Sequence, residues 1–226
     1  MRGLFVTGTD TGVGKTVLAA SIVAALRASG EPVRPLKPVL SGLDEPTDPD
    51  WPPDHELLAR AAGVDPDAVA LIRYGPAVSP HLAAELAGVP IDPAALRTQI
   101  REAVNGCGAA IVEGVGGLLV PIAPGYDVRE LARDLGLRIV IAARTGLGTI
   151  NHTLLTLEAA RSAGLDIAAV VLTPWPESPS AIERSNRETI AALGDVAVAT
   201  LPPVAGATPE QLAAAGATLP LAQWLA

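Results

Sequence analysis

The chain has 226 residues, of which 49% are hydrophobic and 18% charged, and its formal net charge is −8. This composition is typical of a folded globular protein and excludes a disordered one. The acidic balance argues against nucleic acid or an anionic membrane as a partner, and no apolar run reaches the ~18 residues of a membrane-spanning helix. Cys107 is the only cysteine. We therefore expect one cytoplasmic domain spanning residues 1–226, without disulfides.

Short apolar runs alternate with helical patterns along the chain. Strands are predicted at 3–7, 32–36, 109–113, 138–142, 167–172 and 196–201. Helices are predicted at 15–28, 54–62, 80–87, 93–105, 127–135, 149–163, 179–193 and 208–215. The Pro-rich stretch 44–53 is interpreted as a surface loop. Because the strands are apolar on both faces, the pattern predicts an α/β fold of the P-loop type, with a mostly parallel sheet between two helix layers.

Residues 9–16 form a glycine-rich turn between the first strand and the first helix. Glycines let backbone N–H groups converge on phosphate oxygens, and the helix N-terminus adds a positive dipole end. We expect Lys15 to reach the β- and γ-phosphates of a nucleoside triphosphate and Thr16 to ligate Mg²⁺. Thr9 occupies the position where the usual pattern has its first glycine. The turn is therefore a variant P-loop, and a chance glycine turn is the alternative.

Lysine is rare in this chain, with Lys15 and Lys37 the only two. Lys37 comes at the predicted end of the second strand, which is the edge where ligands bind in parallel sheets. Glu113 ends another buried strand and precedes a second run of glycines, a place where an acid can hold Mg²⁺. The alternatives are a solvated lysine and an acid that caps a turn. Asp54 opens the second predicted helix, where it serves equally well as an N-cap or as a metal ligand.

These residues are part of a longer series in which the chain resembles the dethiobiotin synthetase family. The resemblance rests on Val6-Thr7-Gly8-Thr9-Asp10-Thr11, Gly14-Lys15-Thr16, Lys37-Pro38, Ser41-Gly42, Asp54, Ser79-Pro80-His81, Glu113-Gly114, Gly116-Gly117 and Leu147-Gly148-Thr149-Ile150-Asn151-His152. It covers nearly the whole chain. It implies a homodimeric ligase that uses ATP and Mg²⁺ to convert 7,8-diaminopelargonate and CO₂ to dethiobiotin. The implied route passes through a carbamate and a carbamic-phosphoric anhydride.

The resemblance also implies roles for individual residues. Lys37, Lys15 and Thr11 would be catalytic, and Thr16, Asp54 and Glu113 would organise Mg²⁺. The nucleotide would contact Gly12, Val13, Gly14, Lys15, Thr16, Val17, Asp54, Glu113, Gly114, Val115, Gly116, Thr173, Pro174, Leu201, Pro202, Pro203 and Val204. The substrate would contact Ser41 and, at a helix start across the dimer interface, Gly148, Thr149, Ile150 and Asn151. Capping by Thr149 is the structural alternative at that helix start.

Two positions depart from the family pattern. Gly12 stands where some members have Glu, and Thr173 stands where the family often has an Asn that reads adenine. Thr lacks the paired donor and acceptor of an amide, so we expect ATP to work and other triphosphates to bind comparably or better.

Three other functions share this scaffold. A partition or cell-division ATPase carries a lysine early in its P-loop, where this chain has Asp10. An amide ligase of cofactor biosynthesis needs an ammonia-producing domain, for which 226 residues leave no room. The third alternative is a nucleotide-binding subunit without turnover.

Overall fold

The computed structural model describes residues 1–46, 48 and 51–226, and it is built around a seven-stranded sheet. The strand order is β3-β2-β4-β1-β7-β8-β9, and each neighbouring pair is parallel. The strands are β1 (Gly3–Gly8), β2 (Val33–Leu40), β3 (Ala70–Arg73), β4 (Ala109–Glu113), β7 (Arg138–Ala143), β8 (Ile167–Leu172) and β9 (Val198–Thr200). A separate antiparallel pair comprises β5 (Pro121–Ala123) and β6 (Tyr126–Asp127).

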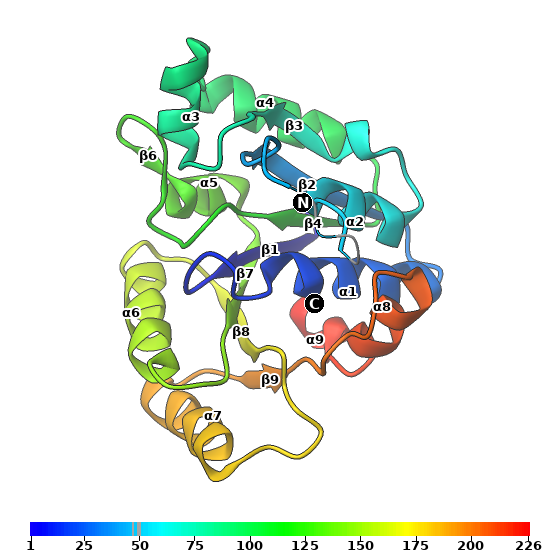
Figure 1. The fold of residues 1–226 in the computed structure, drawn as a ribbon, viewed down its shortest axis with the longest axis vertical. Helices are drawn as coiled ribbons and strands as arrows, with labels where there is room; N and C mark the ends of the chain where they lie inside the picture. The colour runs from blue at the N-terminus through cyan, green and yellow to red at the C-terminus, as the bar shows by residue number, and fades with distance from the viewer. Residues whose placement is uncertain (47, 49–50) are drawn as a thin grey trace.

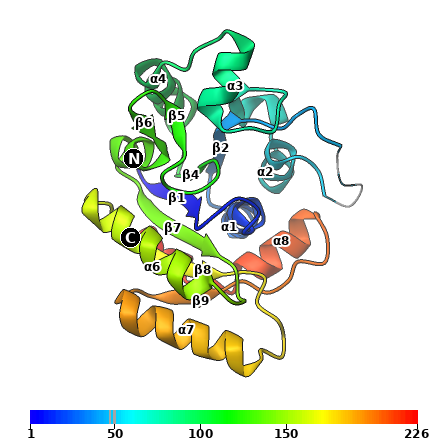
Figure 2. The same ribbon diagram turned by 60° about the vertical axis from the view of Figure 1, so that its left-hand side comes forward.

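Helices cover both faces of the sheet (Figures 1 and 2). One layer contains α1 (Lys15–Ala28), α2 (Asp54–Ala62), α8 (Pro209–Gly216) and α9 (Leu221–Trp224). The other contains α3 (Pro80–Ala87), α4 (Pro93–Ala103), α5 (Val128–Leu135), α6 (Thr149–Ser162) and α7 (Ala181–Gly194). A short 3-10 helix, η1, spans Pro66–Ala68. No helix in the described part is long and apolar enough to cross a membrane.

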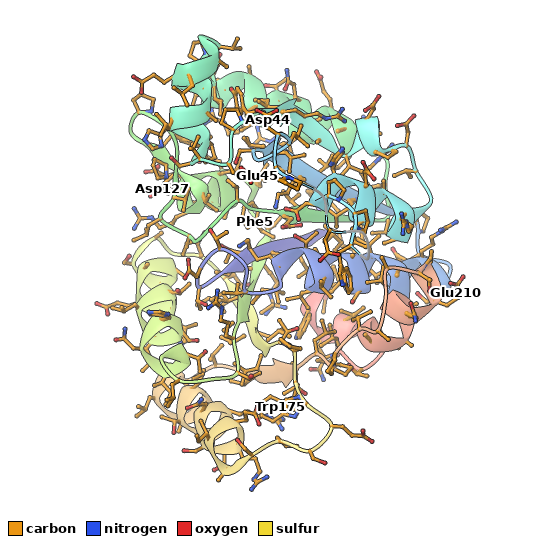
Figure 3. All side chains as sticks on the ribbon, in the orientation of Figure 1. Phe5, Asp44, Glu45, Asp127, Trp175 and Glu210 are labelled. Atoms are coloured by element: carbon orange, nitrogen blue, oxygen red, sulfur yellow. The ribbon has the colours of Figure 1, made fainter. Side chains whose placement is uncertain are left out.

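The central strand β1 shows why two cores form. Successive side chains of a strand point to opposite faces, so Leu4 and Val6 pack with α1 and its layer, while Phe5 packs with the opposite layer. All three side chains are fully buried, and Phe5 lies near the middle of the molecule (Figure 3). The continuous apolar pattern of β1 is therefore the signature of a strand covered on both sides.

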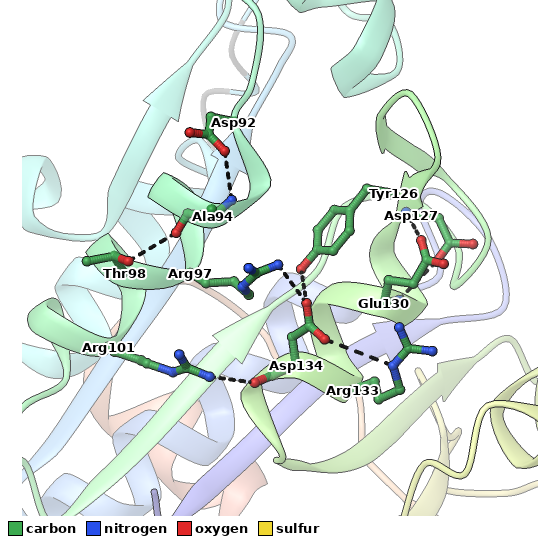
Figure 4. Close-up of polar contacts among 10 residues, drawn as sticks. All are labelled: Asp92, Ala94, Arg97, Thr98, Arg101, Tyr126, Asp127, Glu130, Arg133 and Asp134. Carbon is green, nitrogen blue, oxygen red and sulfur yellow. Dashed lines mark hydrogen bonds and ion pairs between the residues drawn. The ribbon is translucent and has the colours of Figure 1, made fainter.

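A polar network fastens the β5–β6 pair to the helices beside it (Figure 4). Asp134 on α5 accepts hydrogen bonds from Arg97 at 2.9 Å and from the hydroxyl of Tyr126 at 3.0 Å. Its backbone oxygen accepts from Arg101. Burial and contact with Asp134 raise the pKa of Tyr126 to about 12, so the phenol stays neutral and keeps donating. The network therefore joins α4, α5 and β6.

The structure confirms the α/β class and most predicted elements. The main correction is the second strand, predicted at 32–36 but observed at Val33–Leu40. Its extension pairs with β3, which was not predicted because four residues without a clear pattern give no local signal. The strands β5 and β6 and the helix α9 were missed for the same reason. Several other ends shift by one or two residues, which is usual for element boundaries.

Within the predicted loop 44–53, the described residues contain no helix or strand. Residues 47, 49 and 50 lie outside the described part of the chain.

Candidate active site

The phosphate loop lies between β1 and α1, as predicted. Gly12 and Gly14 have φ values of 69° and 89°, a region that favours glycine, and Gly14 is the N-cap of α1. The amide of Thr9 donates to Ala142 of β7 at 3.0 Å, which ties the loop to the sheet. The ammonium of Lys15 donates to the carbonyl of Asp10 at 2.8 Å across the turn. The loop is therefore closed on itself around the helix N-terminus.

A charged cluster lies beside this loop, built from β2, β4 and the starts of α1 and α2. The Nζ atom of Lys37 donates to Oε1 of Glu113 at 2.5 Å and is 2.7 Å from Oδ2 of Asp54. The hydroxyl of Thr16 donates to the same Glu113 oxygen at 2.9 Å. The side chains of Lys37 and Glu113 are 4% and 0% exposed, whereas that of Asp54 is 41% exposed. The cluster is thus buried at Lys37 and Glu113 and open to solvent at the carboxylate of Asp54.

Lys37 lies inside β2 and not at its end, which corrects the predicted position. Its amide donates to the carbonyl of Val69, directly before β3, and the strand continues beyond Lys37 to Leu40. Asp54 is likewise not an N-cap, because Pro53 holds that position and Asp54 is the first helical residue. Its carboxylate is left to face Lys37. A solvated Lys37 and an N-capping Asp54 are therefore wrong.

Burial and charge act in opposite directions within the cluster. Burial is the strongest influence on Glu113 and raises its pKa, although the ammonium groups of Lys37 and Lys15 partly oppose this. Burial also lowers the pKa of Lys15. Burial acts to lower the pKa of Lys37, but Glu113 and Asp54 outweigh it and raise that pKa. Burial likewise disfavours charge on Asp54, but Lys37 outweighs it and lowers the pKa. Lys37 is therefore a permanent cation at neutral pH.

A cavity of about 940 Å³ opens over the cluster and the phosphate loop. Its polar lining includes Thr11, Lys15, Thr16, Lys37, Ser41, Asp54 and Glu113, and its glycines are Gly12, Gly14 and Gly116. Val17 and Val115 complete the set of lining residues that the sequence had singled out. A cavity of this size is appropriate for a nucleotide phosphate chain together with a small second substrate.

Other singled-out residues lie outside that cavity. The side chain of Val13 belongs to the core, and Gly114 is packed so closely that a Cβ there would lie 3.0 Å from Val128. Thr173 is buried against the phosphate loop, since a Cβ on Gly14 would lie 3.0 Å from its methyl group. The segments 173–174 and 201–204 lie side by side, because the amide of Trp175 donates to Leu201 at 2.7 Å.

The helix start at 148–151 also lies apart from this cavity within the subunit. Gly148 is the N-cap of α6, and Thr149 follows it without making a side-chain cap, so capping by Thr149 is wrong. The Thr149 hydroxyl is buried and has no hydrogen-bond partner in the described part of the chain. A second hollow, of about 380 Å³, separates the loop from the outer face of α6.

The sequence did not point to the apolar wall of the cavity. Its members include Leu40, Trp51, Pro52, Leu57, Ala77, Val78 and Val120. Pro80, which belongs to the Ser79-Pro80-His81 segment named above, lines the same wall. Trp51 was the one residue from which this wall could have been predicted, because a tryptophan in a Pro-rich loop needs an apolar surface to contact. Ser79 also lines the cavity, and Ser41 donates to the carbonyl of Val78 at 2.8 Å. Ser41 thus holds in place the segment 77–80, whose place in the site the sequence had left open.

A parallel sheet with a phosphate loop at the carboxyl end of β1, and with Thr16 and Glu113 beside it, defines the class of P-loop nucleotide-binding proteins. The model of the AAA domain family matches residues 2–211. Curated relatives are named ATP-dependent dethiobiotin synthetase BioD. The one from Haloferax mediterranei is 38% identical over 92% of this chain and 87% of its own length. The one from Mycobacterium avium is 42% identical over 87% and 85%. The chain therefore belongs to the ATP-dependent dethiobiotin synthetase family and is an enzyme of the ligase class.

Solved structures confirm the fold alone. A ParA family ATPase from Chlorobium tepidum TLS has a TM-score of 0.54 at 14% identity, covering 98% of this chain and 93% of its own. The septum site-determining protein MinD of Pyrococcus horikoshii OT3, complexed with Mg-ADP, has a TM-score of 0.55 at 17% identity over 96% and 93%. At identities this low, the similarity shows that the folds are alike and says nothing about activity.

Proposed function

We propose that this enzyme forms dethiobiotin from 7,8-diaminopelargonate, CO₂ and ATP, releasing ADP and phosphate. The observation that carries the proposal is Lys37, a buried ammonium placed between two carboxylates at the floor of a cavity that also opens onto the phosphate loop. A switch ATPase needs only the phosphate loop to bind and hydrolyse its nucleotide. Lys37 is a second buried cation beside that loop, and it suits a second anionic reactant. A carbamate is such a reactant.

The proposed reaction needs charge neutralisation more than covalent catalysis. One substrate amine attacks CO₂ and loses a proton, which gives a carbamate. A carbamate oxygen then takes the γ-phosphoryl group, and ADP leaves. The second amine attacks the carbamoyl carbon, expels phosphate and closes the cyclic urea. Lys37 and Lys15 stabilise the negative charge on the carbamate and on the transferring phosphoryl group, while Thr11 and Ser41 orient the amines.

The residues at the cluster also fit a magnesium ion. Oxygen ligands are available from Thr16, Asp54 and Glu113, and the second carboxylate oxygen of Glu113 is buried without a partner in the described structure. Among the described residues, no group of three or more His, Cys, Asp or Glu could hold a metal ion. Nucleotide phosphates and water would therefore supply the remaining ligands. The bound ion would neutralise the β- and γ-phosphates.

The substrate's remote carboxylate would be bound in a homodimer. The N-terminus of α6, at Gly148–Asn151, offers free amides to an anion, but it lies outside the cavity of its own subunit. Leu119, Leu147 and Leu155 are 57%, 89% and 57% exposed nearby, and two of them line the hollow against α6. An exposed apolar group of this kind suits a subunit interface. A partner's helix start would then complete the site.

The test is incubation of the purified enzyme with diaminopelargonate, bicarbonate, Mg²⁺ and ATP, followed by mass detection of dethiobiotin and measurement of released phosphate. We expect equal amounts of the two products. Phosphate release that is independent of the diamine would overturn the proposal and favour a switch ATPase.

The nucleobase preference is a separate prediction. Thr173 is buried with its methyl group against Gly14, so it offers a base no amide pair. We expect CTP and GTP to compete with ATP at comparable or lower concentrations in equilibrium binding. A strong preference for ATP would contradict this prediction without affecting the proposed reaction.

A further inference from the structure

Arg144 lies at the carboxyl end of β7, directly beside the phosphate loop, and no role described above uses it. Its guanidinium donates to the backbone carbonyl of Thr11 at 3.3 Å. A Cβ on Gly12 would lie 3.7 Å from the same group, so the side chain lies along the outside of the turn. Among the described residues, no carboxylate is within ion-pair distance of Arg144.

Arg144 contacts the turn at Thr11 and Gly12. Thr11 and Gly12 are exposed, and Gly12 adopts a left-handed conformation that any glycine can leave easily. The carbonyl of Asp10 already accepts from Lys15 on the inner side. Arg144 holds the next carbonyl from the outer side. Two cations therefore hold two successive carbonyls of the turn. The amide of Thr11 donates to the Asp10 carboxylate at 2.7 Å, so the amide that the Arg144 contact can direct toward a phosphate is that of Gly12.

The backbone that follows Arg144 is anchored by α7. Asn186 on α7 is buried, and its side-chain amide donates to the carbonyl of Thr145 at 2.9 Å and to that of Gly146 at 3.2 Å. A chain of contacts thus runs from α7 through residues 145–146 and Arg144 to the phosphate loop. An anchored residue can order a glycine-rich turn, whereas a mobile side chain cannot.

We propose that Arg144 is a positioning residue for nucleotide binding, which preorganises the Thr11–Gly12 turn around the β-phosphate. A turn that is ordered before binding loses less conformational entropy when the phosphates arrive. The positive charge of Arg144 also favours phosphate in an otherwise acidic protein. The proposal rests on nucleotide binding at the loop and is independent of the second substrate.

The experiment measures equilibrium binding of MgATP, MgADP and AMP to the full chain by calorimetry or NMR titration. In Arg144→Ala we expect the dissociation constants for MgATP and MgADP to rise about tenfold. AMP has no β-phosphate, so its affinity should stay unchanged. Arg144→Lys should recover part of the loss. Arg184→Ala is the matched control and should bind all three nucleotides normally. Arg184 is an exposed arginine that donates to the carbonyl of Pro179 and does not line the cavity.

Asn186→Ala gives a second approach to the same contact. We expect a weaker loss of MgADP affinity, about threefold, and no further loss when it is combined with Arg144→Ala, because both act on one chain of contacts. Wild-type affinity for MgATP and MgADP in Arg144→Ala would overturn the proposal, as would an equal loss for AMP. Because no second substrate is present, failure here is distinct from failure to form dethiobiotin.

Discussion

Lys37 and Glu113 form a buried ion pair at the centre of the proposed site. Both side chains are essentially buried, so each depends on the other for compensation of its charge. Removing one partner of a buried ion pair costs about 3–5 kcal/mol, because the remaining charge stays in a medium that solvates it poorly. Replacing both is much less costly. This asymmetry separates the structural role of the pair from its catalytic role.

We therefore expect Lys37→Met to lower the free energy of unfolding by about 3 kcal/mol, and to lower dethiobiotin formation by about 10²–10³-fold. Adding Glu113→Gln should restore most of the stability and none of the activity. Urea unfolding and the product assay measure the two effects. Activity that returns together with stability would show that Lys37 is only structural.

His55 provides a pH prediction at the same scale. Burial and the nearby Arg73 lower its pKa below the ordinary 6.5, and its Nδ1 atom has no partner in the described structure. The unfolded chain therefore binds the proton more readily, so stability falls as pH drops below 6.5. We expect His55→Gln to weaken this loss in urea unfolding at pH 5.5 compared with pH 7.5. An unchanged pH dependence would exclude His55 as its source.

At the scale of elements, α1 and α8 pack closely against each other. Gly216 ends α8, and a Cβ there would lie 2.0 Å from the backbone oxygen of Ser21 on α1. The absence of a side chain at this position lets the two helices touch. Neither helix can move independently, because Leu212 and Ala20 are buried in the same core.

Gly216→Ala should therefore destabilise the protein by about 1–3 kcal/mol, since overpacking against backbone has no flexible group to yield. The gain in helix propensity, up to ~1 kcal/mol, is too small to offset it. Gly146→Ala is the control, because a Cβ there meets nothing within 4 Å, and it should change stability by less than about 0.5 kcal/mol. Thermal or urea unfolding distinguishes the two variants, and equal stability would contradict the close contact.

At the scale of the whole molecule, the proposed dimer makes one clear prediction. Leu155 lies on the outer face of α6 and is 57% exposed beside the phosphate loop. We expect Leu155→Glu to halve the mass measured by light scattering and to reduce dethiobiotin formation, because each site would lose the helix start of its partner. Leu86→Glu, at a 62% exposed position on α3, should remain a dimer. A monomeric wild-type enzyme with full activity would refute the shared site.

The sequence alone determined the α/β class, because strands that are apolar on both faces can only lie between two helix layers. It also determined the phosphate loop, because the glycines and Lys15 follow the first strand directly, and it pointed to Glu113 at the carboxyl end of another buried strand. Local patterns carried this information. Most helix positions followed for the same reason.

Only the tertiary structure decided how these residues meet. Lys37 lies inside β2 because β3, a strand too short to recognise locally, pairs with the segment beyond Leu36. Asp54, which the sequence left open as an N-cap or a metal ligand, is the second carboxylate that contacts Lys37. Trp51 joins a cavity wall, and Arg144 reaches the loop from 133 positions away in the chain. Such contacts depend on packing between distant segments, for which a single sequence carries no local signal.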